Sequence, residues 1–396
     1  MEMVKHQTNS GAANRSRPDS GSKAQGDGAR LLGVQALRAV GALLVAWAHA
    51  IDEVQGSLGN PLQARFFYFE NFGSSGLDIF FVISGFVVSL VAARAANRDK
   101  ESSGSSAVHF LSRRITRIFP LFLMITAFLL ARVLKAGRLH EAKISWLPTL
   151  LLLPSFDFPA SGPLLSLGWS LIFELYFYLL LAAFLLFTKR SVVRSTVTFL
   201  CGMVALGLIA GFRHPLLIFW MNPLILEFVF GCLIGLLFDR CSKANLSFGR
   251  LGLGLAALGV ALLAATVFTG YGAASAATSI LAGQDCWLRV AVWGLPSALL
   301  VGGVIFCAPA MRSVPARLLV FLGDASYSIY LCTIPALDVI RRFWRHFGSP
   351  GADVGVFQGI LSCVVAGVVC YLIVERPLMR FFHNWYKPIP FHAKQA

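Results

Sequence analysis

Ten apolar runs, each about as long as a membrane-spanning helix, determine what this chain of 396 residues can fold into. A helix needs roughly 20 mostly apolar residues to cross the hydrocarbon layer of a bilayer. The composition agrees, because 57% of the residues are hydrophobic and only 13% are charged, whereas a soluble domain has about 25% charged residues. We therefore expect an all-α integral membrane protein, a bundle of about ten transmembrane helices. The runs fall near 31–50, 76–95, 116–135, 164–187, 192–211, 215–238, 251–270, 287–308, 318–340 and 355–374.

The segments outside these runs are short. Residues 1–29 are polar and rich in Gly and Ser, which predicts a disordered tail, and they lack the apolar core of a cleaved secretory signal. The stretch WLPTLLLLP (146–154) is too short to span and contains two prolines, so we expect an interfacial or re-entrant segment. We expect one multi-span domain over 30–380, and a C-terminal tail over 381–396.

The distribution of lysine and arginine predicts the orientation of the bundle. Cytoplasmic segments of membrane proteins are enriched in these residues. With both termini in the cytoplasm (N-in, C-in), the segments expected inside contain 23 of the 34 lysines and arginines. Topology therefore explains the net charge of +15, and we expect a lipid bilayer and no nucleic acid as the partner. The expected outer segment RRFWRH (341–346) does not follow this rule.

The first apolar run contains two polar residues that suggest function. Arg38 and His49 are eleven residues apart, so in a helix both side chains lie on one face, about 16 Å apart along the axis. They could hold the two ends of one long ligand. The simpler alternatives are that Arg38 extends to the headgroups and that His49 is a neutral interfacial residue.

Two carboxylates lie in other apolar runs. In the predicted orientation Asp78 lies in the outer turn of its helix, level with His49, where it could orient the imidazole or only complement the helix dipole. Glu174 lies about 9 Å below Gly168 along the helix axis. A carboxylate near mid-membrane needs a partner or a water-filled cavity, so Glu174 is a candidate for function.

Three arginines cluster at the inner end of the third predicted span: Arg113, Arg114 and Arg117. Topology alone explains part of this cluster, but guanidinium groups also bind polyphosphates. A histidine with an acid nearby on the opposite side fits general-base chemistry on a hydroxyl. Together these features predict group transfer across the membrane.

Several other function classes lack support in the sequence. The eight cysteines show no CxxC spacing, which argues against a zinc site or a disulfide framework. The phosphate-binding loop, the dinucleotide-binding glycine pattern, HExxH and GxSxG are all missing. We therefore expect no permanently bound cofactor and no metal.

Six motifs in order resemble the membrane acyltransferase family 3. Arg38 and His49 form the first, and GLDIFFVISGF, RRITRIFP, GWSLIFELYFYLLL, GDASYSIYLCTIP and VERPL follow across residues 31–380. The resemblance implies a ten-helix enzyme in the bacterial inner membrane. It would move an acyl group, commonly acetyl, from cytoplasmic acyl-CoA to a hydroxyl of an extracytoplasmic polysaccharide or lipid-linked saccharide.

The resemblance also implies roles for residues. Arg38 and His49 match the family's essential pair, and Glu174 matches its glutamate. Thr333 stands where many members have histidine, so the base is assigned to His49 alone. We expect the acyl-CoA phosphates near Arg38 and the arginine cluster, and substrate contacts from Trp169, Ser170, Tyr327 and Tyr330. The tyrosines could instead only pack against neighbouring helices.

Some alternatives remain open at this point. Depth favours Asp78 as the partner of His49, whereas the resemblance favours Glu174. Direct transfer and a two-step route through an acyl-enzyme are both compatible with these residues. The rival class is a transporter or flippase of a lipid-linked saccharide, which would show internal repeats with paired broken helices. A non-catalytic assembly scaffold would leave Glu174 unexplained.

Overall fold

The computed structural model describes most of the chain. The described residues are 20–58, 72–96, 102–137, 145–154, 162–244, 246, 248–269, 277–307 and 313–385. Within them, nine helical segments are long and apolar enough to cross a membrane, and a bent helix pair makes a tenth. The prediction of an all-α membrane bundle is therefore confirmed, whereas its orientation stays a prediction.

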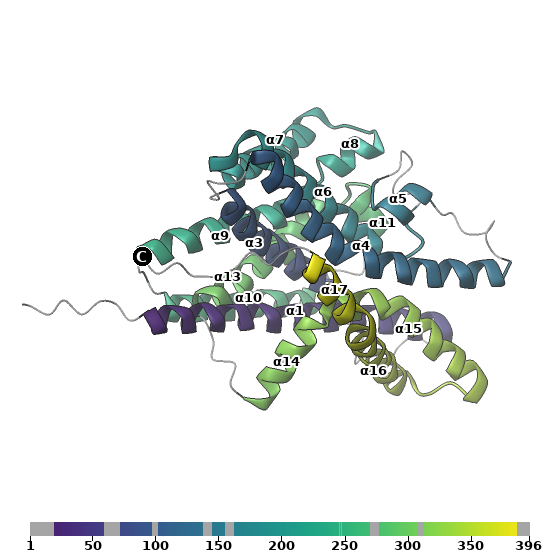
Figure 1. The fold of residues 1–396 in the computed structure, drawn as a ribbon. Coiled ribbons are helices and arrows are strands. Elements are labelled where there is room, and N and C mark those ends of the chain that lie inside the picture. Colours follow the sequence, from purple (N-terminus) through teal and green to yellow (C-terminus); the bar gives the residue numbers. More distant parts are fainter. Residues whose placement is uncertain are drawn as a thin grey trace, which may run out of the picture.

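The long helices correspond to the ten predicted runs (Figure 1). Shorter helices break or flank some of them: α5 (Trp146–Leu151), α8 (Pro215–Trp220), α11 (Ala277–Leu281), α12 (Cys286–Arg289) and α17 (Arg376–Trp385). The long ones are α1 (Ser20–Leu58), α3 (Gly76–Ala96), α4 (Ser103–Lys135), α6 (Gly168–Phe187), α7 (Val192–Ala210), α9 (Leu226–Lys243), α10 (Gly249–Thr269), α13 (Leu295–Cys307), α14 (Val314–Asp324), α15 (Ser326–Phe347) and α16 (Ala352–Cys370).

Two helices begin earlier than their apolar runs. The side chain of Ser102 accepts a hydrogen bond from the backbone N–H of Ser105 and starts α4 thirteen residues before residue 116. The arginines of RRITRIFP therefore lie within a regular helix. Helix α1 begins at Ser20, so residues 20–29 of the predicted tail are helical. Residues 1–19 and 386–396 lie outside the described part of the chain.

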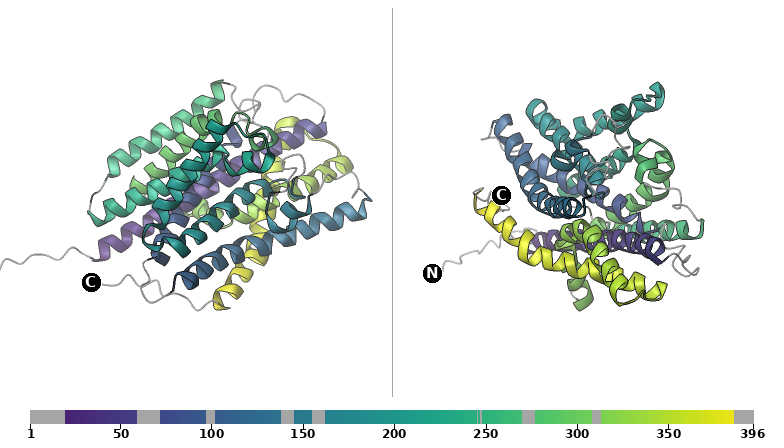
Figure 2. Two further views of the ribbon diagram at one scale, coloured as in Figure 1. Left: turned by 90° about the horizontal axis from the view of Figure 1, so that it is seen from above. Right: turned by 90° about the vertical axis from the view of Figure 1, so that its right-hand side faces the viewer.

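Helix α1 is the element around which the bundle is arranged. It contacts α3, α13, α14, α15 and α16, and it runs between the group formed by α3, α4 and α6 and the group formed by α14 to α16 (Figure 1). Seen from above, most long helices run roughly parallel, whereas α16 and α17 cross them (Figure 2). Because α1 is central, its Arg38 faces neighbouring helices.

The ninth predicted span is broken. Helices α14 and α15 meet at Ala325 with a bend of 71°. The bend lies where α14 approaches α1 so closely that a Cβ on Gly323 would be 1.9 Å from the carbonyl oxygen of Gln35. The first residue of α15, Ser326, therefore lies beside Arg38 of α1.

Candidate active site

A cavity lies where α1, α3, α4, α6 and α15 meet, and it encloses about 730 Å³ of empty space, counting its open mouth. Its lining combines apolar side chains with cations, a carboxylate and hydroxyls. It brings together seven of the predicted site residues: Arg38, Arg114, Arg117, Ser170, Glu174, Tyr327 and Tyr330.

Arg38 enters the cavity from α1. Its Nε donates a hydrogen bond to the Ser326 hydroxyl at 3.2 Å, the residue at the start of α15. Glu174 and Glu375 attract its charge, and Arg117 repels it. Arg38 thus belongs to a mixed charged cluster inside the bundle, which argues against the alternative that it extends to the headgroups.

Glu174 enters from α6 and is held by two hydroxyls. Ser84 of α3 donates to its Oε1 at 3.1 Å, and Tyr178, one turn along α6, donates to the same oxygen. The Tyr178 ring lies 5.7 Å below the Arg114 guanidinium carbon. A carboxylate near mid-membrane is predicted to need polar partners, and these contacts provide them.

The arginine cluster of α4 divides by helix face. Arg114 and Arg117, three residues apart, share a face and line the cavity. Arg114 is 9% exposed and its Nε has no hydrogen-bond partner, although its guanidinium also lies 5.9 Å from the Phe110 ring. Arg113 does not line the cavity, so its predicted contact with the donor phosphates stays a prediction.

His49 does not line the cavity. Eleven residues of α1 separate it from Arg38, about 16 Å along the helix axis. Its side chain is 32% exposed, and its Nδ1 lies 3.6 Å from a carboxylate oxygen of Asp52, one turn further along. The acidic neighbour of His49 is therefore Asp52, a residue outside the predicted site.

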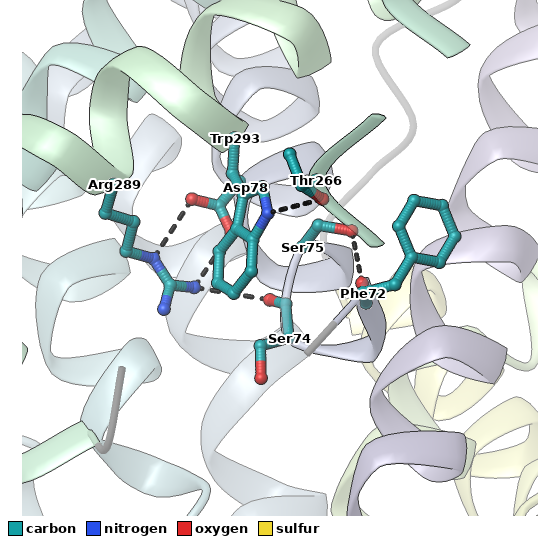
Figure 3. Close-up of polar contacts among 7 residues, drawn as sticks. All are labelled: Phe72, Ser74, Ser75, Asp78, Thr266, Arg289 and Trp293. Atoms are coloured by element: carbon teal, nitrogen blue, oxygen red, sulfur yellow. Dashed lines mark hydrogen bonds and ion pairs between the residues drawn. The ribbon is translucent and has the colours of Figure 1, made fainter. Parts of the chain in front are cut away.

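The predicted pairing of Asp78 with His49 is wrong. Both carboxylate oxygens of Asp78 accept hydrogen bonds from Arg289, at 3.1 and 2.8 Å (Figure 3). The two side chains are 0% and 3% exposed. The Arg289 guanidinium also bonds the Ser74 carbonyl and lies 4.9 Å from the ring centre of Trp293. A buried carboxylate needs a counter-charge, and α12 supplies one from more than two hundred residues away in the chain.

Sequence reasoning missed several polar residues of the site. Glu375, in the VERPL motif, accepts a hydrogen bond from Ser328 of α15 at 2.5 Å and interacts electrostatically with Arg38 and Arg117. The motif itself was the signal, because an acid directly after the last apolar run needs a partner much as Glu174 does. Ser84, Tyr178 and Ser326 were missed as well, although each lies in a quoted motif.

The other predicted contacts divide into lining and packing residues. Tyr330 and Ser170 hydrogen bond each other at 2.7 Å and both line the cavity, as does Tyr327, whose hydroxyl donates to the Ile118 carbonyl. Trp169 does not line it and packs edge-on against Phe81 and Phe173.

Thr333 takes no part in the cavity either. It is fully buried, and its hydroxyl donates to the Ile329 carbonyl of its own helix at 2.9 Å. This contact holds the hydroxyl within α15, away from the cavity.

A bundle of membrane-spanning helices with arginines, one glutamate and tyrosines around a single cavity has the groups that a membrane-embedded group-transfer enzyme needs. The family model described as "Acyltransferase domain" matches residues 31–375. The chain belongs to this acyltransferase family. The resemblance that the six motifs predicted is therefore confirmed.

Three relatives show what the chain is similar to. The exopolysaccharide production protein ExoZ of Rhizobium meliloti (strain 1021) is 30% identical, over 78% of this chain and 90% of the relative. The acyltransferase MdmB of Streptomyces mycarofaciens is 24% identical, over 89% and 92%. Nodulation protein 10 of Rhizobium leguminosarum bv. viciae is 27% identical, over 87% and 92%. No solved structure gives a significant match.

Proposed function

We propose that the protein transfers an acyl group, most simply acetyl, from acyl-CoA to a hydroxyl of a saccharide on the opposite side of the membrane. One observation carries this proposal: three guanidinium groups from two different helices line one cavity that also contains Glu174. The relative named for exopolysaccharide production supports a saccharide acceptor.

The arginines suit a polyphosphate such as the nucleotide end of coenzyme A. Arg38 uses one N–H on Ser326, the Arg114 Nε has no partner, and Arg117 makes no hydrogen bond or ion pair with any residue that the structure describes. Unused guanidinium N–H groups around a partly enclosed cavity favour an anionic ligand, because charge-assisted hydrogen bonds are strong there. The donor phosphates would occupy this cavity.

The reaction would take place toward His49. With the phosphates at Arg38, the pantetheine arm would extend along α1 toward the imidazole, roughly 16 Å away. His49 would remove the proton of the acceptor hydroxyl as its oxygen attacks the thioester carbon. The C–S bond then breaks, and the imidazolium returns its proton to the leaving sulfur. Asp52, 3.6 Å from His49, is the acid best placed to stabilise the imidazolium.

Glu174 and Glu375 have a different role in this proposal. Both interact with the Arg38 end of the pathway and so would position the guanidinium groups for the donor. Their negative charges also offset part of the positive charge of the three arginines, which lowers the free-energy cost of enclosing these arginines in the bundle.

Acyl-CoA consumption by the purified protein tests this function. Protein in lipid nanodiscs with acetyl-CoA and an oligosaccharide mixture should release free thiol and produce esterified saccharide. His49→Ala should reduce the rate by a factor of about 10² to 10⁴ with unchanged folding, as removal of a general base does. Near-normal turnover in this variant would remove His49 as the base, and saccharide movement without acyl-CoA consumption would favour a transporter.

A further inference from the structure

The end of α15 contains basic residues that the proposed transfer does not use. Arg341, Arg342 and Arg345 lie in its last two turns, at the end of the bundle that also contains His49. In the N-in orientation this end faces outward, where lysine and arginine are depleted. The three arginines are contrary to this distribution of lysine and arginine, so their presence at this end requires another explanation.

A second, polar pocket lies beside this segment. It encloses about 680 Å³, counting its open side, between the end of α1 and the end of α15. Asp52, Glu53 and Gly56 line it from α1. These are three, four and seven residues after His49, so they continue the helix face on which His49 lies. The pocket is therefore the next polar space beyond the proposed base.

Neighbouring helices fix part of the pocket wall. Asp338 of α15 binds Arg132 of α4 and Arg341. The Nε of Arg341 also lies 3.5 Å from a carboxylate oxygen of Glu53, which links α1 to α15. Trp344 is buried and donates to the Gln358 side chain at 2.7 Å. Contacts among four helices, α1, α4, α15 and α16, therefore hold this wall, which does not depend on a single exposed side chain.

One cation of the pocket has no partner in this network. Arg345 lines the pocket, is exposed, and makes no hydrogen bond or ion pair with any described residue. Arg341 is already neutralised by Glu53 and Asp338. Arg345 therefore offers a complete guanidinium fork, the group that best matches a carboxylate or phosphate, beside carboxylates that accept hydrogen bonds from hydroxyls.

We propose that this pocket binds an acidic saccharide as the acceptor, with its carboxylate or phosphate on Arg345 and its hydroxyls on Asp52 and Glu53. The inference rests on the proposed function and names the substrate class of that site. Binding in this way places a sugar hydroxyl next to His49, one helical turn from the pocket wall.

Binding of a matched pair of oligosaccharides tests the proposal. The probes are cellotetraose and its uronic acid counterpart, in which each primary alcohol is a carboxylate. They are titrated without acyl-CoA into the full chain in phosphatidylcholine nanodiscs. We expect the acidic form to bind about ten times more tightly, the effect of one charge-assisted contact of roughly 1.4 kcal/mol, and the preference to decrease with salt.

Two variants assign the preference to a residue. Arg345→Gln should bind both probes equally. Arg342→Gln is the matched control, because Arg342 is exposed on the same helix but does not line the pocket, and it should retain the preference. Equal binding of both probes by the wild type, binding of neither, or loss of the preference in both variants would overturn the proposal.

An anionic lipid headgroup has the same charge chemistry, and a second arm separates it. If phosphatidylglycerol added to the nanodiscs abolishes oligosaccharide binding by the wild type, the pocket is a lipid site and the proposal is overturned. Binding that persists supports the saccharide. The binding experiment contains no acyl-CoA, so a negative result in it does not contradict acyl transfer. A negative result in the acyl-transfer assay likewise does not contradict the binding result.

Discussion

At the scale of single residues, Arg38 provides the sharpest test of the donor site. Arg38→Lys keeps the charge but loses the planar fork whose Nε bonds Ser326. We expect the KM for acetyl-CoA to rise about tenfold, the value of one charge-assisted hydrogen bond. Arg113→Lys is the control, because Arg113 belongs to the basic cluster but does not line the cavity. An unchanged KM in Arg38→Lys would remove Arg38 from the donor site.

Asp78 and Arg289 form a buried ion pair, for which we predict a structural role. Asp78→Asn removes the carboxylate charge that pairs with the buried Arg289 guanidinium, which is 3% exposed, and breaking such a buried pair typically destabilises a protein by about 3–5 kcal/mol. Thermal unfolding in detergent should show a large decrease in melting temperature. Adding Arg289→Met should recover much of the loss. A double variant as unstable as the single variant would mean that the pair is not the cause.

The same pair marks the limit of residue-level prediction. The sequence marks Arg38 and Glu174 as candidates, because a charge in an apolar run always needs an explanation. It could not identify the partner of Asp78, because Arg289 is 211 positions away and only helix packing brings the two together. His49 shows a similar limit. Its acidic neighbour, Asp52, is three residues along its own helix, whereas the expected depth in the membrane predicted Asp78 of another helix.

At the scale of helices, close backbone contact between α3 and α9 supports the cavity wall. A Cβ on Gly85 would lie 2.2 Å from the Phe228 carbonyl oxygen, and on Gly231 2.1 Å from that of Val82. Gly85→Ala should force the helices apart and destabilise the protein by about 1–3 kcal/mol. Gly254→Ala is the control, because nothing lies within 4 Å of its added Cβ. Equal melting temperatures of the two variants would contradict this packing.

The number and type of helices followed from the sequence for a physical reason. In a bilayer, backbone groups must be satisfied within the segment, so an apolar run of sufficient length is a helix. The bend between α14 and α15 was not predictable in this way. It depends on the contact of Gly323 with the backbone of Gln35, and that contact exists only once α14 packs on α1. The bend is also what brings Ser326 to Arg38.

At the scale of the whole molecule, the proposed reaction depends on which way the bundle crosses the membrane. Arg38, in the middle of α1, and the proposed base His49, nearer its C-terminal end, lie about 16 Å apart along the helix axis. If α1 runs from the cytoplasm outward, acyl-CoA meets Arg38 and the saccharide meets His49. The distribution of lysine and arginine supports this orientation, with 23 of 34 in the segments expected inside. The basic end of α15 opposes it, unless those arginines bind an acceptor.

Cysteine labelling in whole cells decides the orientation. Single cysteines replace Ser20 and Ser57, at the two ends of α1, in a background without the eight native cysteines. With an impermeant thiol reagent, position 57 should label in intact cells and position 20 only after lysis. Labelling of both positions after lysis is the control for accessibility. The reverse pattern would place His49 in the cytoplasm, and transfer across the membrane would then be wrong even though the chain is an acyltransferase.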